Sequence, residues 1–306
     1  QLTALSWVLI VIYGMVTIVR RSFAPNLLPV PISTALATFV PLIFCFVHGA
    51  LNYRRRDLLV FAAITLGVSN LFENLSVLTG FPFGHYVYSD LLGPKLFLVP
   101  VLIGPAYLGT AYLAWTIAQV ILGATHGDRR GHLTFTVPHL AAFMMVSWDL
   151  SFDPIFSTIN HAWIWRDGGS YFGVPFSNFM GWLLTTFVFL QLFALYLQRQ
   201  PRLPAAAEQP SSLQSLPAIV FYALIAAGYL LNTLTMKMSG TVSDPAGVLW
   251  RMQDIYVVTG LVAIFTMGTF TLLALVKLME VSPAVQNVSV AAASSATNTW
   301  VERRKP

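Results

Sequence analysis

The stretch LLVFAAITLGVSNLFENLSVLT, residues 58–79, decides the class of fold. It is long enough to cross the roughly 30 Å hydrocarbon core of a bilayer as one helix, and Glu73 near its end is its single charged residue. Apolar runs of similar length recur along the chain at 2–19, 33–51, 96–123, 134–151, 178–198, 216–236 and 254–279. The sequence therefore predicts an all-α, polytopic integral membrane bundle of about eight transmembrane helices.

The composition agrees with a membrane protein. The chain has 306 residues, of which 56% are hydrophobic and 9% are charged, and its mean hydropathy is +0.70, which is too apolar for an ordinary soluble domain. The run at 2–19 lacks a basic flank and a small-residue cleavage site, so we expect a retained span and not a removed signal peptide. We expect one helical domain over 1–280 and a polar, disordered tail over 281–306.

The distribution of basic residues predicts an orientation. Eleven of the 17 Lys and Arg residues fall on one side of the predicted bundle, many of them in the short connections RRRD (54–57), GDRRG (127–131) and QRQPR (198–202). The positive-inside rule places that side, and with it both termini, in the cytoplasm. The net charge of +5 then reflects topology and attraction to lipid headgroups. It is not the footprint of a nucleic-acid partner.

Acidic residues gather at the opposite, outer ends of the spans. Glu73, Asp149 and Asp254 are expected at one membrane level, and Asp153 follows Asp149 by one turn, where Pro154 marks the exit from the helix. A carboxylate in or near a span costs at least ~2.5 kcal/mol, so it is normally paired, protonated or functional. The loops of this face also hold most of the glycine, proline and ring residues outside the spans.

An internal likeness indicates a tandem repeat of helical hairpins. The first hairpin carries Glu73, then Tyr86-Val87-Tyr88, Val99-Pro100 and Tyr107. The second carries Asp149, then Trp163-Ile164-Trp165, Val174-Pro175 and Trp182. A repeat would set the two acids around one cavity; the alternative is a chance likeness in a chain rich in rings.

Each candidate residue also has a structural interpretation. Glu73 could bond Asn70, Asn74 or a loop amide, and Asp149 could cap a helix end or pair with Arg166. Asp153 fits a turn at a helix exit better than it fits chemistry, and Asp254 could pair with Arg251 one turn before it. The rings could be membrane-interface anchors, or they could shelter a carbocation.

Other chemistries fit the sequence poorly. The six histidines form no zinc motif, and the usual nucleotide and serine-hydrolase motifs are missing. Asp149 and Asp153 resemble a magnesium site for a diphosphate, but a second aspartate-rich segment is lacking. Proton-coupled transport stays open as an alternative, although no acid lies at mid-span, where an alternating-access site is expected.

Two long stretches carry a resemblance to a known family. Residues 73–100, ENLSVLTGFPFGHYVYSDLLGPKLFLVP, and residues 148–182, WDLSFDPIFSTINHAWIWRDGGSYFGVPFSNFMGW, resemble the signature regions of the carotenoid biosynthesis membrane proteins. The resemblance spans roughly 58–270, and the family's characterised members are carotenoid 1',2'-hydratases. It implies cofactor-independent addition of water to the terminal double bond of an acyclic carotenoid or isoprenoid, with no metal.

That reaction needs a proton donor, a shelter for the tertiary cation and a group that activates water. We expect Glu73 and Asp149 to supply the acid and the water-orienting base, in either order, with Asp153 and Asp254 as secondary candidates. The substrate-binding candidates are Asn74, His85, Tyr86, Tyr88, Trp148, Trp163, Trp165, Asn178 and Trp182. The runner-up activity is a protonation-initiated terpene cyclase, and the alternative of another class is a transporter or lipid-binding scaffold.

Overall fold

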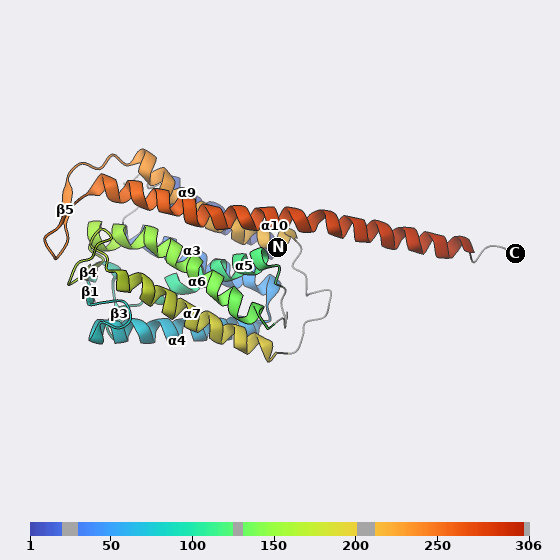
Figure 1. Cartoon of the computed structure of the whole chain (residues 1–306), viewed down its shortest axis with the longest axis horizontal. Coiled ribbons are helices and arrows are strands. Elements are labelled where there is room, and N and C mark those ends of the chain that lie inside the picture. The colour runs from blue at the N-terminus through green and yellow to red at the C-terminus, as the bar shows by residue number, and fades with distance from the viewer. Residues whose placement is uncertain (20–29, 125–130, 201–211, 303–306) are drawn as a thin grey trace.

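The protein is a bundle of long, roughly aligned helices (Figure 1). The computed structural model describes residues 1–19, 30–124, 131–200 and 212–302, and side chains over 1–18, 32–124, 131–200 and 214–280. The α-helices of the described residues are α1 (Leu2–Tyr13), α3 (Val30–Asn52), α4 (Arg55–Thr79), α5 (Ile103–Leu122), α6 (Leu133–Asp153), α7 (Phe176–Gln198), α9 (Ser212–Thr235) and α10 (Met252–Glu302). One lies at each predicted span, which confirms the all-α membrane fold.

Three short helices complete the set. The π-helix η1 (Gly14–Val19) continues α1, the π-helix η3 (Pro154–Ile159) continues α6, and the 3₁₀-helix is η2 (Asp90–Leu92). Pro154 was expected to mark the helix exit, and α6 does end at Asp153. The chain nevertheless stays helical for six more residues because η3 follows directly.

Helices inside the bundle differ from those at its surface. Among the described helices, α3, α4, α7, α9 and α10 are long and apolar enough to cross a membrane. Every residue of α5 from Tyr107 to Gln119 is buried, and α6 buries Ser147, Asp149, Ser151 and Asp153. Helices that face other helices can carry such polar groups, whereas helices that face lipid cannot.

Glycines allow close backbone contacts within the bundle. A Cβ atom at Gly109 of α5 would lie 2.7 Å from Cβ of Pro41 and 2.9 Å from the backbone nitrogen of Leu42 in α3. At Gly181 of α7, a Cβ would lie 2.9 Å from the carbonyl carbon of Pro82, in the loop after α4. Small residues are what such backbone approaches require.

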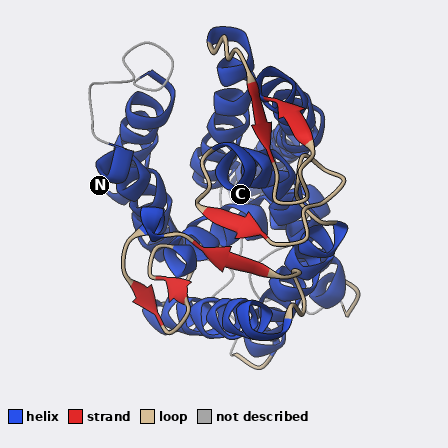
Figure 2. Ribbon diagram, turned by 90° about the vertical axis from the view of Figure 1, so that its left-hand side faces the viewer, coloured by secondary structure: helices blue, strands red, loops and turns tan. Residues whose placement is uncertain are grey.

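The strands of the described residues all lie at one end of the bundle (Figure 2). They form three antiparallel pairs, β1 (Tyr86–Tyr88) with β4 (Trp163–Trp165), β2 (Lys95–Leu96) with β3 (Val99–Pro100), and β5 (Thr241–Ser243) with β6 (Leu249–Arg251). In the first pair Val87 lies opposite Ile164, the matching residue of the other hairpin. The pairing is thus centred on the equivalent residues of the two hairpins, and the repeat of whole hairpins stays a prediction.

The start of α1 and the last described turn of α10 lie away from the strands (Figure 1). This arrangement agrees with an even number of crossings. Parts of the basic connections, at 129–130 and 202, lie outside the described residues, so the cytoplasmic placement of the termini stays a prediction. The backbone of α10 continues as a helix to Glu302, over residues where the sequence predicts a polar, disordered tail (281–306), and side chains beyond Glu280 lie outside the described set.

Candidate active site

Glu73 lies on α4, two turns before the left-handed Gly80 that ends this helix. Its side chain is 4% exposed and accepts three phenol hydrogen bonds. Tyr86 and Tyr88 of β1 donate to Oε2, the latter at 2.8 Å. Tyr107 of α5 donates to Oε1 at 2.8 Å. The expected bonds to Asn70, Asn74 or a loop amide are replaced by this cage of hydroxyls.

The phenols of β1 stay protonated. Burial raises the pKa of Tyr86 and of Tyr88 well above the ordinary value, and the neighbouring Glu73 carboxylate raises both further. A protonated phenol can donate to a carboxylate, and its oxygen can also accept. Glu73 is therefore surrounded by groups that can hold its charge or pass on a proton.

Asp153, at the end of α6, has a matching environment. Its side chain is 1% exposed, and Oδ1 accepts the indole N–H of Trp163 at 2.9 Å and of Trp165 at 3.2 Å. Oδ2 accepts the amide of Asn178 in α7 at 2.7 Å. The aromatic pair of β4 thus holds Asp153 as the pair of β1 holds Glu73. Asp149 was expected to match Glu73, and the structure gives that place to Asp153.

Asp149 lies one turn deeper in α6, behind Asn178. The amide nitrogen of Asn178 donates to Asp149 Oδ2 at 2.8 Å as well as to Asp153, so one amide bridges two carboxyls. Oδ1 of Asp149 is buried and has no hydrogen-bond partner among the described residues. Within the part of the chain that the structure describes, no ion pair reaches Glu73, Asp149 or Asp153, so the expected pairing of Asp149 with Arg166 is wrong.

A cavity of about 50 Å³ lies between the two acid–aromatic groups. Nine of the predicted residues line it, namely Glu73, Tyr86, Tyr88, Trp148, Asp153, Trp163, Trp165, Asn178 and Trp182. Asp149 is not among the lining residues. Tyr107 and Phe152 also line it and were not selected from the sequence, although Tyr107 stands in the repeat opposite Trp182. The rings of Tyr107 and Trp182 stack at 4.3 Å.

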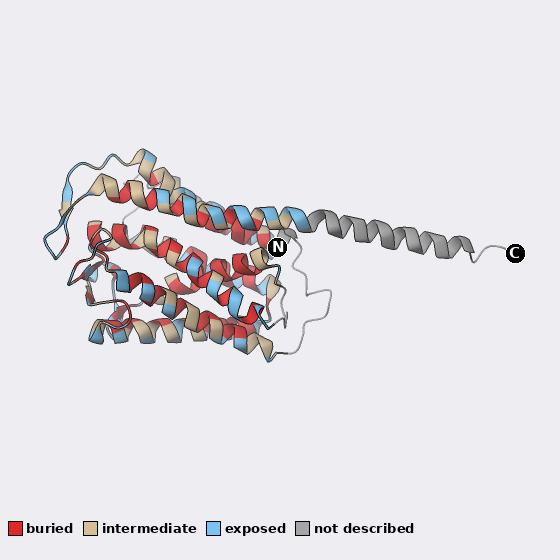
Figure 3. Cartoon of the chain, in the orientation of Figure 1, coloured by how far each residue is buried: buried red, intermediate tan, exposed pale blue. Residues whose placement is uncertain are grey.

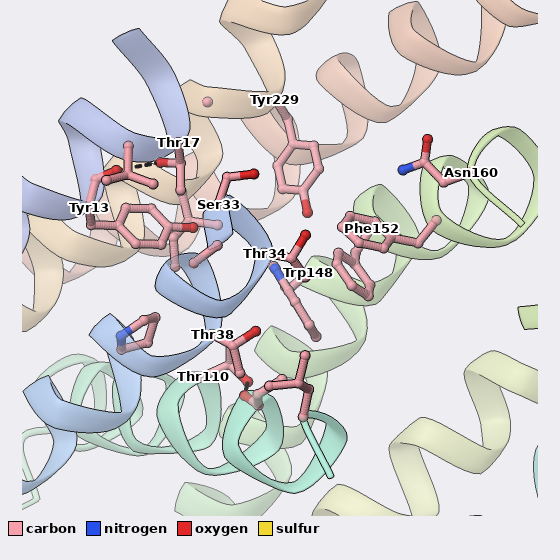
Figure 4. A pocket seen from close by; sticks show the side chains of 18 of the residues that line it. Tyr13, Thr17, Ser33, Thr34, Thr38, Thr110, Trp148, Phe152, Asn160 and Tyr229 are labelled. Carbon is pink, nitrogen blue, oxygen red and sulfur yellow. Dashed lines mark hydrogen bonds between the residues drawn. The ribbon is translucent and has the colours of Figure 1, made fainter. Parts of the chain in front are cut away.

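A second cavity of about 500 Å³ adjoins the first (Figure 4). Both are bordered by Ile103, Ala106, Trp148, Phe152 and Trp163. One side of the larger cavity, the chamber, is a series of rings in which Trp148 stacks on Phe152 at 4.4 Å and Phe152 on Phe156 at 4.0 Å. A long apolar molecule in the chamber could therefore place one end beside Asp153 and Glu73.

Three predicted residues lie away from both cavities. Asp254 forms an exposed ion pair with Arg251 at 2.8 Å, so its structural interpretation is the right one. The ring of His85 is 60% exposed and pairs with Asp167 at 3.2 Å. Asn74 accepts the backbone N–H of Leu98 at 3.0 Å and so supports a loop.

Buried residues lie mainly where the helices face one another, whereas the β5–β6 segment is mostly exposed (Figure 3). Glu73, Asp149, Asp153 and Asn178 are all at most 4% exposed, whereas the ion pair of Asp254 is open to its surroundings.

Comparisons with known proteins give a family and one curated relative. Residues 30–243 match the family described as carotenoid biosynthesis protein. A bisanhydrobacterioruberin hydratase of Haloarcula japonica is 35% identical over 144 residues. That match covers 45% of this chain and 45% of the relative, so the two correspond over less than half of their lengths. No solved structure matches the chain.

Proposed function

Because the chain belongs to the carotenoid biosynthesis protein family, we propose that it adds water to the terminal double bond of an acyclic carotenoid or a related isoprenoid. The observation that carries the proposal is the meeting of two buried carboxyls, Glu73 and Asp153, at the end of a ring-walled chamber. The hydratase among its relatives supports the same class of reaction.

The first step is protonation of the alkene by Asp153. The proton bonds to the less substituted carbon, the π pair is used up, and a tertiary cation forms on the carbon that bears two methyl groups. Asp153, a secondary candidate from the sequence, takes this role in place of Asp149 because its carboxyl borders the cavity. Proton transfer from a positioned carboxyl typically contributes 10²–10⁴-fold, roughly, to a rate.

Asp149 and Asn178 help to keep a proton on the carboxyl pair. Two ionised carboxyls on one buried amide would repel each other in a medium of low dielectric, so the pair holds one proton between them. Asn178 keeps both oxygens in place at 2.8 and 2.7 Å. Asp149 is thus a positioning residue that shares the proton of Asp153.

Glu73 and the rings stabilise the cation. Three phenol hydrogen bonds stabilise the charged form of Glu73, and a carboxylate beside the chamber attracts the positive charge formed there. The ring faces of Trp148 and Phe152 add a further attraction. Water then forms a C–O bond to the tertiary carbon and loses one proton, which restores the carboxyl pair.

A second outcome of the same cation is cyclisation. The stacked rings of Trp148, Phe152 and Phe156 could shelter a cation while an internal double bond attacks it. The product would then be an isomer of the substrate. Cyclisation would use the same proton donor, Asp153, and the same chamber as hydration.

Product mass separates the alternatives. Membranes containing the full chain are supplied with an acyclic carotenoid, and the products are analysed by mass spectrometry. Hydration predicts a gain of one water. An isomer of unchanged mass would contradict hydration and support cyclisation. An unchanged substrate pool would contradict both activities and support a transporter or a lipid-binding scaffold.

A further inference from the structure

The chamber has two unlike walls. The side formed by α6 and η3 carries the ring faces of Trp148, Phe152 and Phe156. Other sides carry hydroxyl groups, and Figure 4 shows them around the same space. These are Thr17 of η1, Ser33, Thr34 and Thr38 of α3, Thr110 of α5 and Tyr229 of α9. We call this set the hydroxyl wall.

A pure hydrocarbon cannot form hydrogen bonds with the hydroxyl wall. Hydroxyl groups that face an apolar occupant gain no hydrogen bond from it, so the hydrogen-bonding capacity that their contacts within the protein leave over stays unused. Yet four separate elements direct hydroxyls at this one space. The polyene fits the ring wall, so the hydroxyl wall calls for an occupant that can form hydrogen bonds.

Two of these hydroxyls can only accept from that occupant. Thr17 donates its proton to the carbonyl of Tyr13 at 2.6 Å, and Thr110 donates to the carbonyl of Ala106 at 2.7 Å. Their remaining lone pairs accept hydrogen bonds. A water molecule bound through its own O–H groups keeps a lone pair free for attack.

The hydroxyl wall extends to the acid cavity. Thr110 lies one turn beyond Ala106, and Ala106 borders both cavities. A water held near Thr110 would therefore lie close to the place where the cation forms. The chamber, at about 500 Å³, has room for water beside a chain, since one water needs only about 30 Å³.

We propose that the hydroxyl wall is the binding subsite of the second substrate, water, and that it decides how the cation is used. This inference rests on the proposed hydratase function. With the wall intact, water adds its oxygen to the cationic carbon and releases one proton to the carboxyl pair. Without it, the cation loses a proton from a neighbouring carbon to the same carboxylate, and an alkene re-forms.

The test measures the division between these two fates in D₂O. The full chain in membranes converts an acyclic carotenoid, and mass spectrometry quantifies the hydrate and the deuterium in the recovered alkene. A recovered molecule that was protonated and then lost H⁺ carries one deuterium. Their sum reports protonation, and their ratio reports capture by water.

Thr34 and Thr38, one turn apart on the same face of α3, are the residues to change. Thr34→Val and Thr38→Val keep the shape of each side chain and remove its hydroxyl. We expect the ratio of hydrate to deuterated alkene to fall about fivefold for each, as loss of one hydrogen bond allows, with the sum within twofold of wild type. Thr34→Ser, which keeps a hydroxyl, should restore the ratio.

Thr269→Val is the matched control. Thr269 is exposed on α10 and donates to the carbonyl of Phe265 at 2.7 Å, so its change should leave both sum and ratio unaltered. An unchanged ratio in the Thr34 and Thr38 variants would overturn the inference, and so would a proportional fall of both products.

Two further results have distinct meanings. If the variants change only the preference between polyenes with and without a hydroxyl group, the wall binds the substrate's own hydroxyl and the inference is wrong. If the unaltered chain makes neither hydrate nor deuterated alkene, the proposed function itself fails, and the inference fails with it.

Discussion

The two hairpins hold their acids by the same geometry with different chemistry. Glu73 is bound by phenols from Tyr86 and Tyr88, whereas Asp153 is bound by indoles from Trp163 and Trp165. A phenol can donate, accept and pass on a proton, but an indole N–H is only a donor. The α6–α7 hairpin therefore fixes its acid in place, and the α4–α5 hairpin surrounds its acid with exchangeable protons.

This difference allows the two similar hairpins to have different chemical roles. The hairpins place matching Tyr-Val-Tyr and Trp-Ile-Trp strands opposite each other. The first hairpin has Tyr and Glu where the second has Trp and Asp, so the chemistry differs while the arrangement of strand and acid is the same. In our proposal Asp153, with Asp149 behind it, is the proton donor, and Glu73 is the charge that stabilises the cation.

The largest effect is expected for Asp153→Asn. The amide keeps the size of the side chain but cannot donate a carboxyl proton, so hydration should fall about 10³-fold, within the range of general acid catalysis. The rate of hydrate formation at saturating substrate measures this. Asp244→Asn is the control, because Asp244 also accepts an indole N–H, from Trp250 at 2.9 Å, outside the cavities. Equal losses in the two variants would contradict a catalytic role.

Glu73→Gln should have the next largest effect, about 10²-fold, because it removes a charge that stabilises the cation. The proton donor remains, so deuterium exchange into the alkene should also persist at a reduced rate. A loss greater than that of Asp153→Asn, with exchange abolished, would reverse the two roles. The same rate assay and the same exchange assay distinguish these results.

Tyr107→Phe tests the contribution of a single hydrogen bond to the role of Glu73. The phenol of Tyr107 donates to Glu73 Oε1 at 2.8 Å, and a bond to a charged group is worth about 1.5–3 kcal/mol. We expect roughly a tenfold slower reaction, with the ring stack on Trp182 preserved. The matched change Tyr222→Phe removes a buried phenol bonded to the Met144 carbonyl and should leave the rate per folded molecule unaltered.

The smallest effects are expected outside the two acid–aromatic groups. Asp254→Asn removes an exposed ion pair with Arg251, and such pairs contribute about 0–1 kcal/mol to stability. His85→Gln removes an exposed ring from the same face of the bundle. Both variants should hydrate within twofold of wild type, as measured by hydrate formation in membranes. A tenfold loss in either would enlarge the site beyond the two hairpins.

Much of the fold was predictable because the bilayer imposes a length and a composition on each span. The exceptions are physical. Helices α5 and α6 carry buried polar residues because other helices surround them. These polar residues lower the hydropathy of the two helices, although both lie inside the bundle. The short strands were not predicted, although the matching Tyr-Val-Tyr and Trp-Ile-Trp stretches are what pair in β1 and β4.

The site was predictable in its residue types more than in its pairings. The repeat pointed to Glu73 and to the rings, but it selected Asp149 where the structure places Asp153 against the indoles. Sequence spacing alone could not decide this, because η3 keeps the chain helical past Pro154 and sets the return path of β4. Asp254 was equally compatible with an ion pair and a site residue, and only its exposure decides.

The central claim is that a proton from Asp153 opens the terminal double bond for water. The most direct test is the deuterium content of the product formed in D₂O by wild type and by Asp153→Asn. The account predicts a wild-type product with one carbon-bound deuterium next to the carbon that bears the new hydroxyl, and almost no labelled product from the variant. Wild-type levels of labelled hydrate from Asp153→Asn would contradict it.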